Sequence, residues 1–394
     1  MVRPAIELPT KLIEISEGGG GSMKAGTIRI GVIGAGGFGL YALQHFTQIP
    51  GVSLVGMAGT HREAAFAVAQ RFGIPDIEDV DALVGRPDID LIYIATPPFL
   101  HHPQAMKALQ AGKHVICEKP LAMTLAQADE MIAIAREKHL ALIANLMQRY
   151  NPLYDIVRQL IESKALGEFL HGYFENYASD EGLGPQHWFW DRAKSGGIFI
   201  EHGVHFFDMF AGWLGHGEVV GAQRTIRPGT NFEEQVNCTV RYRDGMPVNF
   251  YHGFTQPNRM DRQEFRLLFE LGDLTLEEWV PIRARLHAAV DEKRTRTLMD
   301  LFRGARLDVS QIYGGKTREM TSRHKNWDAY QVLDLHWGDE VEKMHRYGEL
   351  LRSVLRDQVR WIYDRSHERK LTEQNGRDSL ALGIRATELA DRCS

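Results

Sequence analysis

The sequence predicts an α/β protein, with a doubly wound parallel sheet in its N-terminal part and a second domain built on a different kind of sheet. Three observations predict this class. Short apolar runs alternate with helical stretches from Thr27 onward, a glycine-rich turn follows the first run, and beyond residue 151 the periodicity changes. At 394 residues the chain is also longer than one ordinary hydrophobic core, which favours two domains.

The N-terminal domain is expected over residues 23–150, with strands and helices in alternation. The expected strands are Ile28–Ile33, Val52–Ala58, 91–95, His114–Cys117 and 141–145. One helix is expected to open at the glycine turn, and the others are expected at Arg62–Phe72, 103–111 and 125–138. Thr124 and Gln127 have capping-box spacing at the start of the last helix. Repeated strand–helix units of this kind predict a parallel sheet.

The glycine turn has the spacing of a dinucleotide-binding fingerprint. It follows a strand, opens a helix, and places glycines at three fixed positions. In that setting one glycine makes the tight turn, one lets backbone N–H groups approach a pyrophosphate, and one allows close helix–sheet packing. The candidate cofactor-binding residues here are Gly34, Gly36, Gly37, Phe38 and Gly39.

The choice between NAD and NADP stays open. NAD sites usually carry an Asp or Glu near the end of the second strand, whereas this strand runs into Gly59, Thr60, His61 and Arg62. Arg62, with Thr60, suits a 2′-phosphate, because a guanidinium matches phosphate oxygens. Arg62 is equally suited to be a solvated residue in the first turn of a helix.

The ends of two later strands supply further candidates. In a parallel doubly wound sheet the ligand lies outside the carboxyl ends of the strands. One strand ends in Ala95, Thr96 and Pro97, followed by His101, which is alternatively a helix-capping or surface histidine. The next strand ends in Glu-Lys-Pro at 118–120, where the proline limits the backbone and can aim the Lys119 amine at a bound nicotinamide.

The second domain is expected over residues 151–394. Strand-rich segments are expected at 167–177 and 233–252, and in the second of these Val236, Cys238, Val240 and Tyr242 alternate with polar residues. One-sided alternation predicts a sheet with one buried face, unlike the parallel sheet before it.

A cluster of acids and histidines lies between those strand segments. If the residues after Gly196 and Gly197 are helical, Glu201, His205 and Asp208 fall on one face. A carboxylate beside an imidazole is suited to proton transfer near neutral pH, although Glu201 is alternatively a structural carboxylate. His202 and His205 have no third ligand at a recognisable spacing, so no metal site is predicted.

Two tryptophans near this cluster, Trp188 and Trp190, are candidates for the lining of a sugar pocket. The alternative is that they are core residues, as most large aromatic side chains are.

Composition narrows the class of protein. The net charge of −5 gives no basic surface for nucleic acid, and no apolar run approaches the ~18 residues of a membrane span. The three cysteines form neither a disulfide framework nor a zinc motif, so a cytoplasmic protein is expected. Residues 1–22 end in a Gly-Gly-Gly-Gly-Ser run before Met23; they are interpreted as a fusion remnant or a disordered leader and are left out of the fold.

Taken together, these motifs resemble the Gfo/Idh/MocA family of glucose–fructose oxidoreductase, inositol dehydrogenase and their relatives. The resemblance runs from about residue 28 to 214 and returns in a terminal helix at 376–391. It rests on the glycine fingerprint, Ala-Thr-Pro at 95–97 with His101, Ala-Gly-Lys-His-Val at 111–115, Glu-Lys-Pro at 118–120, Arg-Tyr-Asn-Pro at 149–152, and the Gly-Gly…His-x-x-Asp segment ending at Asp208.

The resemblance implies a Rossmann domain and a C-terminal α+β domain with an open mixed β-sheet that often makes oligomer contacts. It implies Lys119 and His205 at the reacting centre, assisted by Glu201, and Glu118 near the nicotinamide ribose. Gln148 joins the cofactor-binding candidates. The substrate-binding candidates are Lys119, Arg149, Tyr150, Trp188, Glu201, His202 and His205.

Two departures from the family pattern stand out. The family often has Asp four residues before the catalytic histidine, whereas this chain has Glu201, which is one methylene longer. The stretch 277–340 is longer and more charged than usual, which fits an insertion serving as a lid, a subunit contact or a surface excursion.

The expected function is hydride transfer between NAD or NADP and a secondary hydroxyl or ketone of a sugar, polyol or cyclitol. One alternative is an NAD-dependent glycosidase that oxidises, eliminates and reduces again. A second alternative is a non-enzymatic nucleotide-sensing regulator. The expected partners are a small carbohydrate and further copies of the chain in a dimer or tetramer, with no nucleic acid and no membrane.

Overall fold

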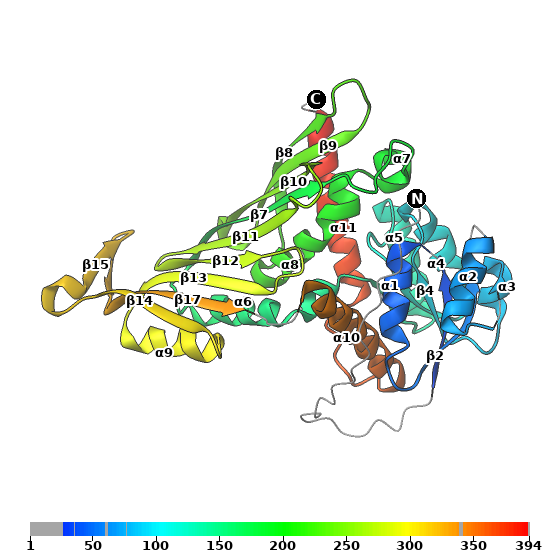
Figure 1. Ribbon diagram of the computed structural model, residues 1–394, viewed down its shortest axis with the longest axis horizontal. Helices are drawn as coiled ribbons and strands as arrows, with labels where there is room; N and C mark the ends of the chain where they lie inside the picture. The colour runs from blue at the N-terminus through cyan, green and yellow to red at the C-terminus, as the bar shows by residue number, and fades with distance from the viewer. Residues whose placement is uncertain (1–26, 35, 60–61, 76, 339–341, 393–394) are drawn as a thin grey trace.

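The computed structural model describes residues 27–34, 36–59, 62–75, 77–338 and 342–392. Its N-terminal domain is a six-stranded sheet in the order β3-β2-β1-β4-β5-β6, and all of its strand pairs are parallel (Figure 1). The strands are β1 (Ile28–Ile33), β2 (Val52–Ala58), β3 (Ile77–Glu78), β4 (Leu91–Ile94), β5 (His114–Cys117) and β6 (Leu142–Ala144). The doubly wound parallel sheet predicted from the sequence is therefore confirmed.

Helices connect these strands, as expected for a parallel sheet. They are α1 (Gly37–Phe46), α2 (Arg62–Phe72), α3 (Val80–Gly85), α4 (His101–Gln110) and α5 (Leu125–Glu137). Strands β4 and β6 are buried along their whole length, which explains their continuous apolar sequence. Thr124 caps α5 by accepting from the backbone N–H of Gln127 at 3.2 Å.

The second domain is built on a nine-stranded mixed sheet in the order β14-β17-β13-β12-β11-β7-β10-β9-β8. Strands β7 and β10 pair in parallel, and the other pairs are antiparallel. The open mixed sheet is thus confirmed. Its strands are β7 (Phe169–Ser179), β8 (Glu218–Ile226), β9 (Glu233–Arg241), β10 (Pro247–Gln256), β11 (Arg262–Phe269), β12 (Gly272–Glu277), β13 (Arg283–Val290), β14 (Arg306–Ile312) and β17 (Gln331–Gly338).

One face of this sheet packs against helices α6 (Pro152–Ser163) and α8 (Val204–Leu214). Val236, Cys238 and Val240 of β9 point into the core that these helices complete. Phe206 of α8 stacks on Phe174 of β7, with ring centroids 3.6 Å apart. The alternation along β9 therefore predicted the buried face correctly.

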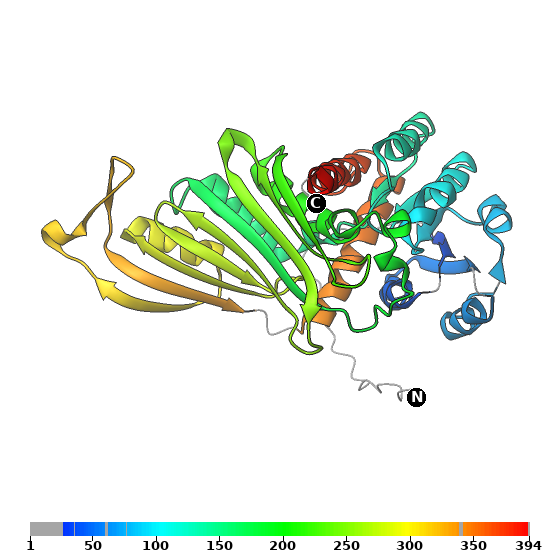
Figure 2. The same ribbon diagram turned by 90° about the horizontal axis from the view of Figure 1, so that it is seen from above.

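The stretch 277–340 contributes three strands to the sheet. Strands β13, β14 and β17 extend it, and α9 (Glu292–Leu301) lies between β13 and β14 in the chain. A two-stranded hairpin of β15 (Glu319–Ser322) and β16 (Lys325–Asp328) projects at the end of the molecule farthest from the N-terminal domain (Figures 1 and 2). The expected insertion thus includes an extension of the sheet, and its hairpin lies away from the N-terminal domain.

The last two helices join the domains. Helix α10 (Lys343–Tyr363) packs against α1, where the Tyr41 hydroxyl donates to the Met344 carbonyl and Arg352 contacts the His45 ring at 2.8 Å. Helix α11 (Glu373–Arg392) contacts α5 and β6 on one side and α8 and β8 on the other. The domain boundary expected near residue 151 assigns α10 to the second domain. In the structure, α10 packs against the N-terminal domain.

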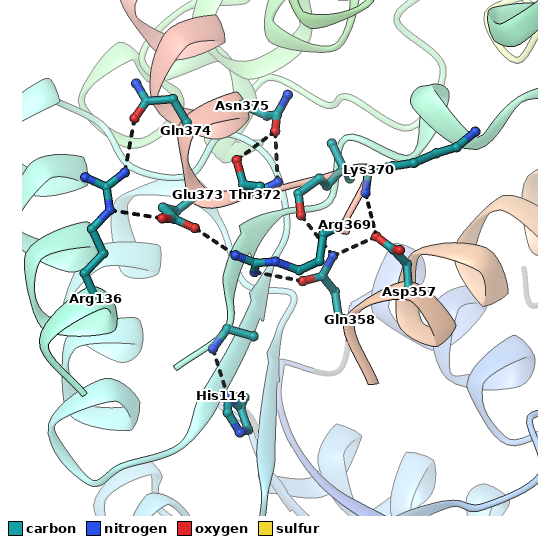
Figure 3. A network of polar contacts seen from close by, with 12 residues as sticks. His114, Arg136, Asp357, Gln358, Arg369, Lys370, Thr372, Glu373, Gln374 and Asn375 are labelled. Carbon is teal, nitrogen blue, oxygen red and sulfur yellow. Dashed lines mark hydrogen bonds and ion pairs between the residues drawn. The ribbon is translucent and has the colours of Figure 1, made fainter. Parts of the chain in front are cut away.

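A polar network fixes the segment between these helices (Figure 3). Arg369 donates to Gln358 and to Glu373, both at 3.2 Å, and Glu373 also accepts from Arg136 of α5 at 3.0 Å. This network ties α10, α11 and the N-terminal domain together, so the two domains hold a defined relative position. None of the described helices has both the length and the apolar character needed to cross a membrane.

Candidate active site

A cavity of about 880 Å³ lies where the two domains meet. The N-terminal domain contributes the glycine turn and the carboxyl ends of β4 and β5. The second domain contributes the segment before α8, the ends of β7 and β11, and the start of α10. Its lining includes Gly34, Gly36, Gly37, Phe38, Gly39, Ala95, Thr96, Pro97, Glu118, Lys119, Trp188, Glu201, His202 and His205, all named among the sequence-based candidates.

The glycine turn has the geometry that the fingerprint predicts. Gly34 has a φ of 108°, and a side chain there would meet the Ala95 carbonyl oxygen at 2.5 Å. Nothing lies within 4 Å of the position that a side chain would take at Gly36 or Gly37. The main chain is therefore open to a ligand at the N-terminus of α1, where backbone N–H groups and the helix dipole favour a phosphate. This arrangement fits the pyrophosphate of a dinucleotide.

Glu118 is a buried acid at the wall of the cavity. Its carboxylate accepts hydrogen bonds from the Tyr93 hydroxyl at 2.5 Å and from the Asn145 amide at 2.8 Å. Burial raises its pKa, while both hydrogen bonds act in the opposite direction. The carboxylate is thus held at the end of β5, where it can accept from a ribose hydroxyl.

Lys119 comes directly after Glu118 and precedes a cis peptide bond to Pro120. Its amine donates to the Glu201 backbone carbonyl at 2.7 Å and pairs with the Glu201 carboxylate at 2.5 Å. Glu201 lies in a π-helical turn, η4 (Phe199–Gly203), immediately before α8. Such turns are rare and frequently occur at functional sites. The contact brings together two candidates that are 82 positions apart in the sequence.

His101 lies behind this contact and does not line the cavity. It is fully buried, and its two ring nitrogens contact the backbone carbonyls of Pro120 at 2.7 Å and Thr96 at 2.8 Å. The alternative that His101 is a surface histidine is therefore wrong. Its buried position also does not indicate direct contact with a cofactor. Instead, His101 holds the turn that carries Lys119 against the end of β4.

His205 lies in the first turn of α8 and lines the cavity. Its Nδ1 atom is buried and has no hydrogen-bond partner among the described residues. Burial lowers its pKa well below the usual 6.5, and the nearby Lys119 lowers it further. His205 is therefore neutral at neutral pH and able to accept a proton.

Three neighbouring candidates are directed away from the cavity. Gln148 is fully buried and donates to the Trp279 carbonyl, and the Tyr150 hydroxyl donates to Asp357 at 2.5 Å. Arg149 pairs with Asp208 at 2.7 Å, which fixes the 3₁₀ turn η2 (Met147–Tyr150) against α8. The structure does not bring these residues to the site, and it shows that Asp208 anchors α8 instead of facing the cavity with Glu201 and His205.

The two candidate tryptophans, Trp188 and Trp190, lie in different environments. Trp188 lines the cavity, whereas Trp190 is buried in the core and its ring N–H donates to the Leu183 carbonyl at 2.9 Å. Thr60 and His61 lie outside the described residues, and Arg62 is described only as the first residue of α2. No group of described residues has the ligands to hold a metal ion.

Several lining residues were not predicted from the sequence. Asn176 and Gln263 reach the cavity from the sheet, and Trp279, Lys343 and Tyr347 reach it from the loop after β12 and from α10. Trp279 packs edge-on against Tyr347, with ring centroids 4.8 Å apart. The spacing of Lys343 and Tyr347, four residues apart, was a signal that they share a helix face. Asn176 and Gln263 could be placed in the site only from the register of the sheet, which cannot be read from the sequence.

The fold and this site define a two-domain protein with a dinucleotide-binding Rossmann domain. Residues 28–146 match the family model of an oxidoreductase family with an NAD-binding Rossmann fold, GFO_IDH_MocA, and residues 154–275 match the GFO/IDH/MocA C-terminal domain. A 1,5-anhydro-D-fructose reductase from Ensifer adhaerens is 32% identical over 58% of this chain and 69% of its own length. The chain belongs to the GFO/IDH/MocA family.

Other relatives are similar over shorter stretches. A dTDP-3,4-didehydro-2,6-dideoxy-alpha-D-glucose 3-reductase from Streptomyces violaceoruber is 37% identical over 36% of this chain and 42% of its own length. The scyllo-inositol 2-dehydrogenase (NAD(+)) of Bacillus subtilis is 29% identical over 48% of this chain and 54% of its length. The chain thus spans roughly half the length of most of the curated relatives that it matches.

Solved structures share the whole fold. Levoglucosan dehydrogenase in complex with NADH and L-sorbose has a TM-score of 0.75 at 20% identity and covers 94% of this chain and 98% of its own. The WlbA dehydrogenase from Bordetella pertussis, in complex with NADH and UDP-GlcNAcA, has a TM-score of 0.76 at 19% identity and covers 95% and 98%. The two-domain architecture is therefore that of a known group of dehydrogenases.

Proposed function

We propose that this protein transfers hydride between NAD or NADP and a secondary hydroxyl or ketone of a sugar, polyol or cyclitol. The observation that carries the proposal is that Lys119, Glu201 and His205 line the same cavity as the glycine turn. Related proteins include sugar and inositol dehydrogenases and reductases, which supports the same class of reaction.

The residues of this chain have separate roles in that reaction. When bound, the nicotinamide cofactor supplies the hydride acceptor or donor. In the oxidation direction the His205 imidazole accepts the hydroxyl proton, and the carbon-bound hydrogen leaves with its electron pair as hydride. Lys119 donates a hydrogen bond to the substrate oxygen and stabilises its developing negative charge. Glu201 orients the Lys119 amine through the contact described above.

The cofactor end of the cavity is formed mainly by main chain. Gly36 and Gly37 leave room for the pyrophosphate at the N-terminus of α1, and Glu118 accepts from the ribose. Phe38 and Tyr347, with ring centroids 5.5 Å apart, also line the cavity. Both NAD and NADP are candidates, because Arg62 with Thr60 suits a 2′-phosphate and Arg62 is equally suited to be a solvated residue at the start of α2.

The test is production of reduced cofactor on mixing the protein with NAD or NADP and a panel of sugars, polyols and cyclitols. We expect an absorbance rise that slows when the reacting C–H is deuterated, because hydride leaves from that carbon. Hydrolysis of a glycoside without net reduced cofactor would identify the redox-neutral glycosidase instead. Cofactor binding with no turnover across the panel would identify a nucleotide sensor.

A further inference from the structure

Three polar side chains lie next to one another across the end of the nine-stranded sheet that borders the cavity. Asn176 of β7 pairs with His252 of β10 on one side and with Gln263 of β11 on the other. All three are buried, with exposures of 1%, 0% and 6% respectively. They point to the face that also carries Phe174 and Phe265. Neighbouring strands in a sheet lie about 4.7–4.9 Å apart, so the three form one continuous row.

Each member of this row has a polar atom without a partner. The unpartnered atoms are Nδ2 of Asn176, Nε2 of His252 and Oε1 of Gln263. Buried polar groups in native proteins are nearly always hydrogen-bonded, and each exception requires an explanation. Asn176 and Gln263 line the cavity, so a ligand there is within reach of their amides.

His252 lies behind the cavity and contacts a fourth polar residue. Its Nδ1 atom is 3.0 Å from Nδ1 of His202, which lines the cavity in the turn before α8. Between two neutral imidazoles, one nitrogen must donate and the other accept. Because Nε2 of His252 has no partner, the less costly arrangement leaves it as a lone pair and places the proton on Nδ1. His252 then donates to His202, whose own proton is left on Nε2 as a donor to the cavity.

The cavity has no unpaired positive charge among its described lining residues. Lys119 pairs with Glu201, and Lys343 pairs with Glu278 at 2.7 Å. The acids Glu118 and Asp261 also line it. A carboxylate or phosphate on the substrate would thus lose its hydration without gaining a free cation, which is unfavourable. Amide and imidazole groups, in contrast, donate to and accept from hydroxyls without any net charge.

We propose that Asn176, Gln263 and His202 form a neutral hydrogen-bonding wall that binds the non-reacting hydroxyls of an uncharged carbohydrate, and that His252 is the positioning residue that fixes the tautomer of His202. The proposal rests on the proposed function, since it assigns the substrate side of the same site. Trp188 completes the wall with an apolar surface for the C–H groups of a sugar ring. Substrates that place a phosphate, a carboxylate or a nucleotide against this wall are excluded.

The electrostatics of the wall are consistent with this assignment. Burial lowers the pKa of His202 to about 3, and it lowers the pKa of His252 well below 6.5. Lys119 contributes to the first shift, and His202 to the second. Both rings therefore stay neutral throughout the physiological range, which keeps the wall uncharged.

The first experiment compares matched neutral and charged probes on the cofactor-saturated protein. The probes are D-glucose and myo-inositol against glucose 6-phosphate, glucuronate and dTDP-glucose, with binding followed by calorimetry and turnover by reduced cofactor. We expect a neutral probe to bind at least about tenfold more tightly than the charged probes, a difference of about 1.4 kcal/mol. Tighter binding of a charged probe, or binding of none of the five, would overturn the proposal.

The second experiment removes the wall one group at a time. Gln263→Met and Asn176→Leu each remove an amide, and each should raise KM for the preferred neutral probe by about five- to tenfold with kcat changed much less. The control is Asn237→Leu on the exposed face of β9, which should leave both constants unchanged. Unchanged KM in both wall variants would contradict the assignment.

The role of His252 has its own readout. In His252→Leu, nitrogen-15 NMR of labelled histidines should show His202 losing its single Nε2–H tautomer, with KM raised. His252→Gln retains a donor and should restore both the tautomer and KM. An unchanged His202 tautomer in the leucine variant would refute the positioning role. The binding arm also separates the two proposals: if sugars bind to the wall but no hydride is transferred, the proposed redox function fails while the wall stands.

Discussion

The two sides of the cavity are built by different means. On the N-terminal side, the main chain at Gly34, Gly36 and Gly37 makes the ligand surface, with Glu118 and Lys119 at the end of a single strand. On the sheet side, the surface consists of side chains from separate strands that only the register brings together, such as Asn176 and Gln263. The first side therefore suits a constant ligand, and the second can be changed residue by residue to suit different substrates.

The largest expected effect is at the point where the two sides meet. Lys119→Ala removes the donor to the reacting oxygen, and the loss of one such donor lowers kcat by about 10²–10³. His205→Ala should also abolish most turnover, because it removes the proton acceptor. Cofactor binding, measured by fluorescence, should persist in both variants, since neither residue belongs to the glycine turn. Lys107→Ala, at an exposed ion pair with Asp81, is the control with normal kcat. Near-normal turnover in either active-site variant would refute the assignment.

The sheet side should also be sensitive to acid. The folded protein holds His252 neutral with a pKa well below 6.5, whereas the unfolded chain binds a proton near pH 6.5. A buried neutral histidine therefore contributes to the free energy of unfolding above about pH 6.5, and this contribution is lost as the pH falls below that value. The loss is about 2 kcal/mol per buried histidine between pH 7 and pH 5. His252→Leu removes one such group, so its unfolding free energy should fall less over this interval than that of the wild type. Equal losses in the two proteins would contradict the burial of a neutral imidazole.

The smallest of the expected effects is on the N-terminal side of the cavity, where a side chain added to a glycine should weaken cofactor binding. Gly36→Ala adds a methyl group where nothing lies within 4 Å, so the free protein should keep its Tm. The same methyl group occupies the space for the pyrophosphate, so the cofactor Kd should rise at least about tenfold, or about 1.4 kcal/mol. Gly85→Ala, equally uncrowded but remote from the cavity, is the matched control. An unchanged Kd would show that the dinucleotide does not approach Gly36.

The same contrast explains what the sequence could and could not predict. The boundaries of β1, β2, α2 and β5 were predicted, because apolar runs, glycines and caps are local signals. The short pair β3 and α3 was missed, since a strand of two residues has no periodicity. Local motifs also identified Lys119, Glu201 and His205 as candidates.

Local sequence patterns could not predict the roles of residues that depend on sheet register or long-range packing. Asn176, His252 and Gln263 become one row only when three strands are aligned, and the sequence gives no rule for that alignment. Gln148 and Arg149 were placed in the site by family resemblance, yet their side chains are used by Trp279 and Asp208. His101 was an ambiguous histidine until its two carbonyl contacts gave it a structural role.

The most direct test of the central claim is a structure of the ternary complex with NAD or NADP and a neutral sugar or polyol. We expect the pyrophosphate at Gly36, and one substrate carbon facing the reactive nicotinamide carbon. The oxygen on that carbon should lie within hydrogen-bond distance of Lys119 Nζ and the His205 ring, with other hydroxyls on Asn176 and Gln263. A carbohydrate bound with its reacting oxygen away from both Lys119 and His205 would contradict the roles proposed for these two residues.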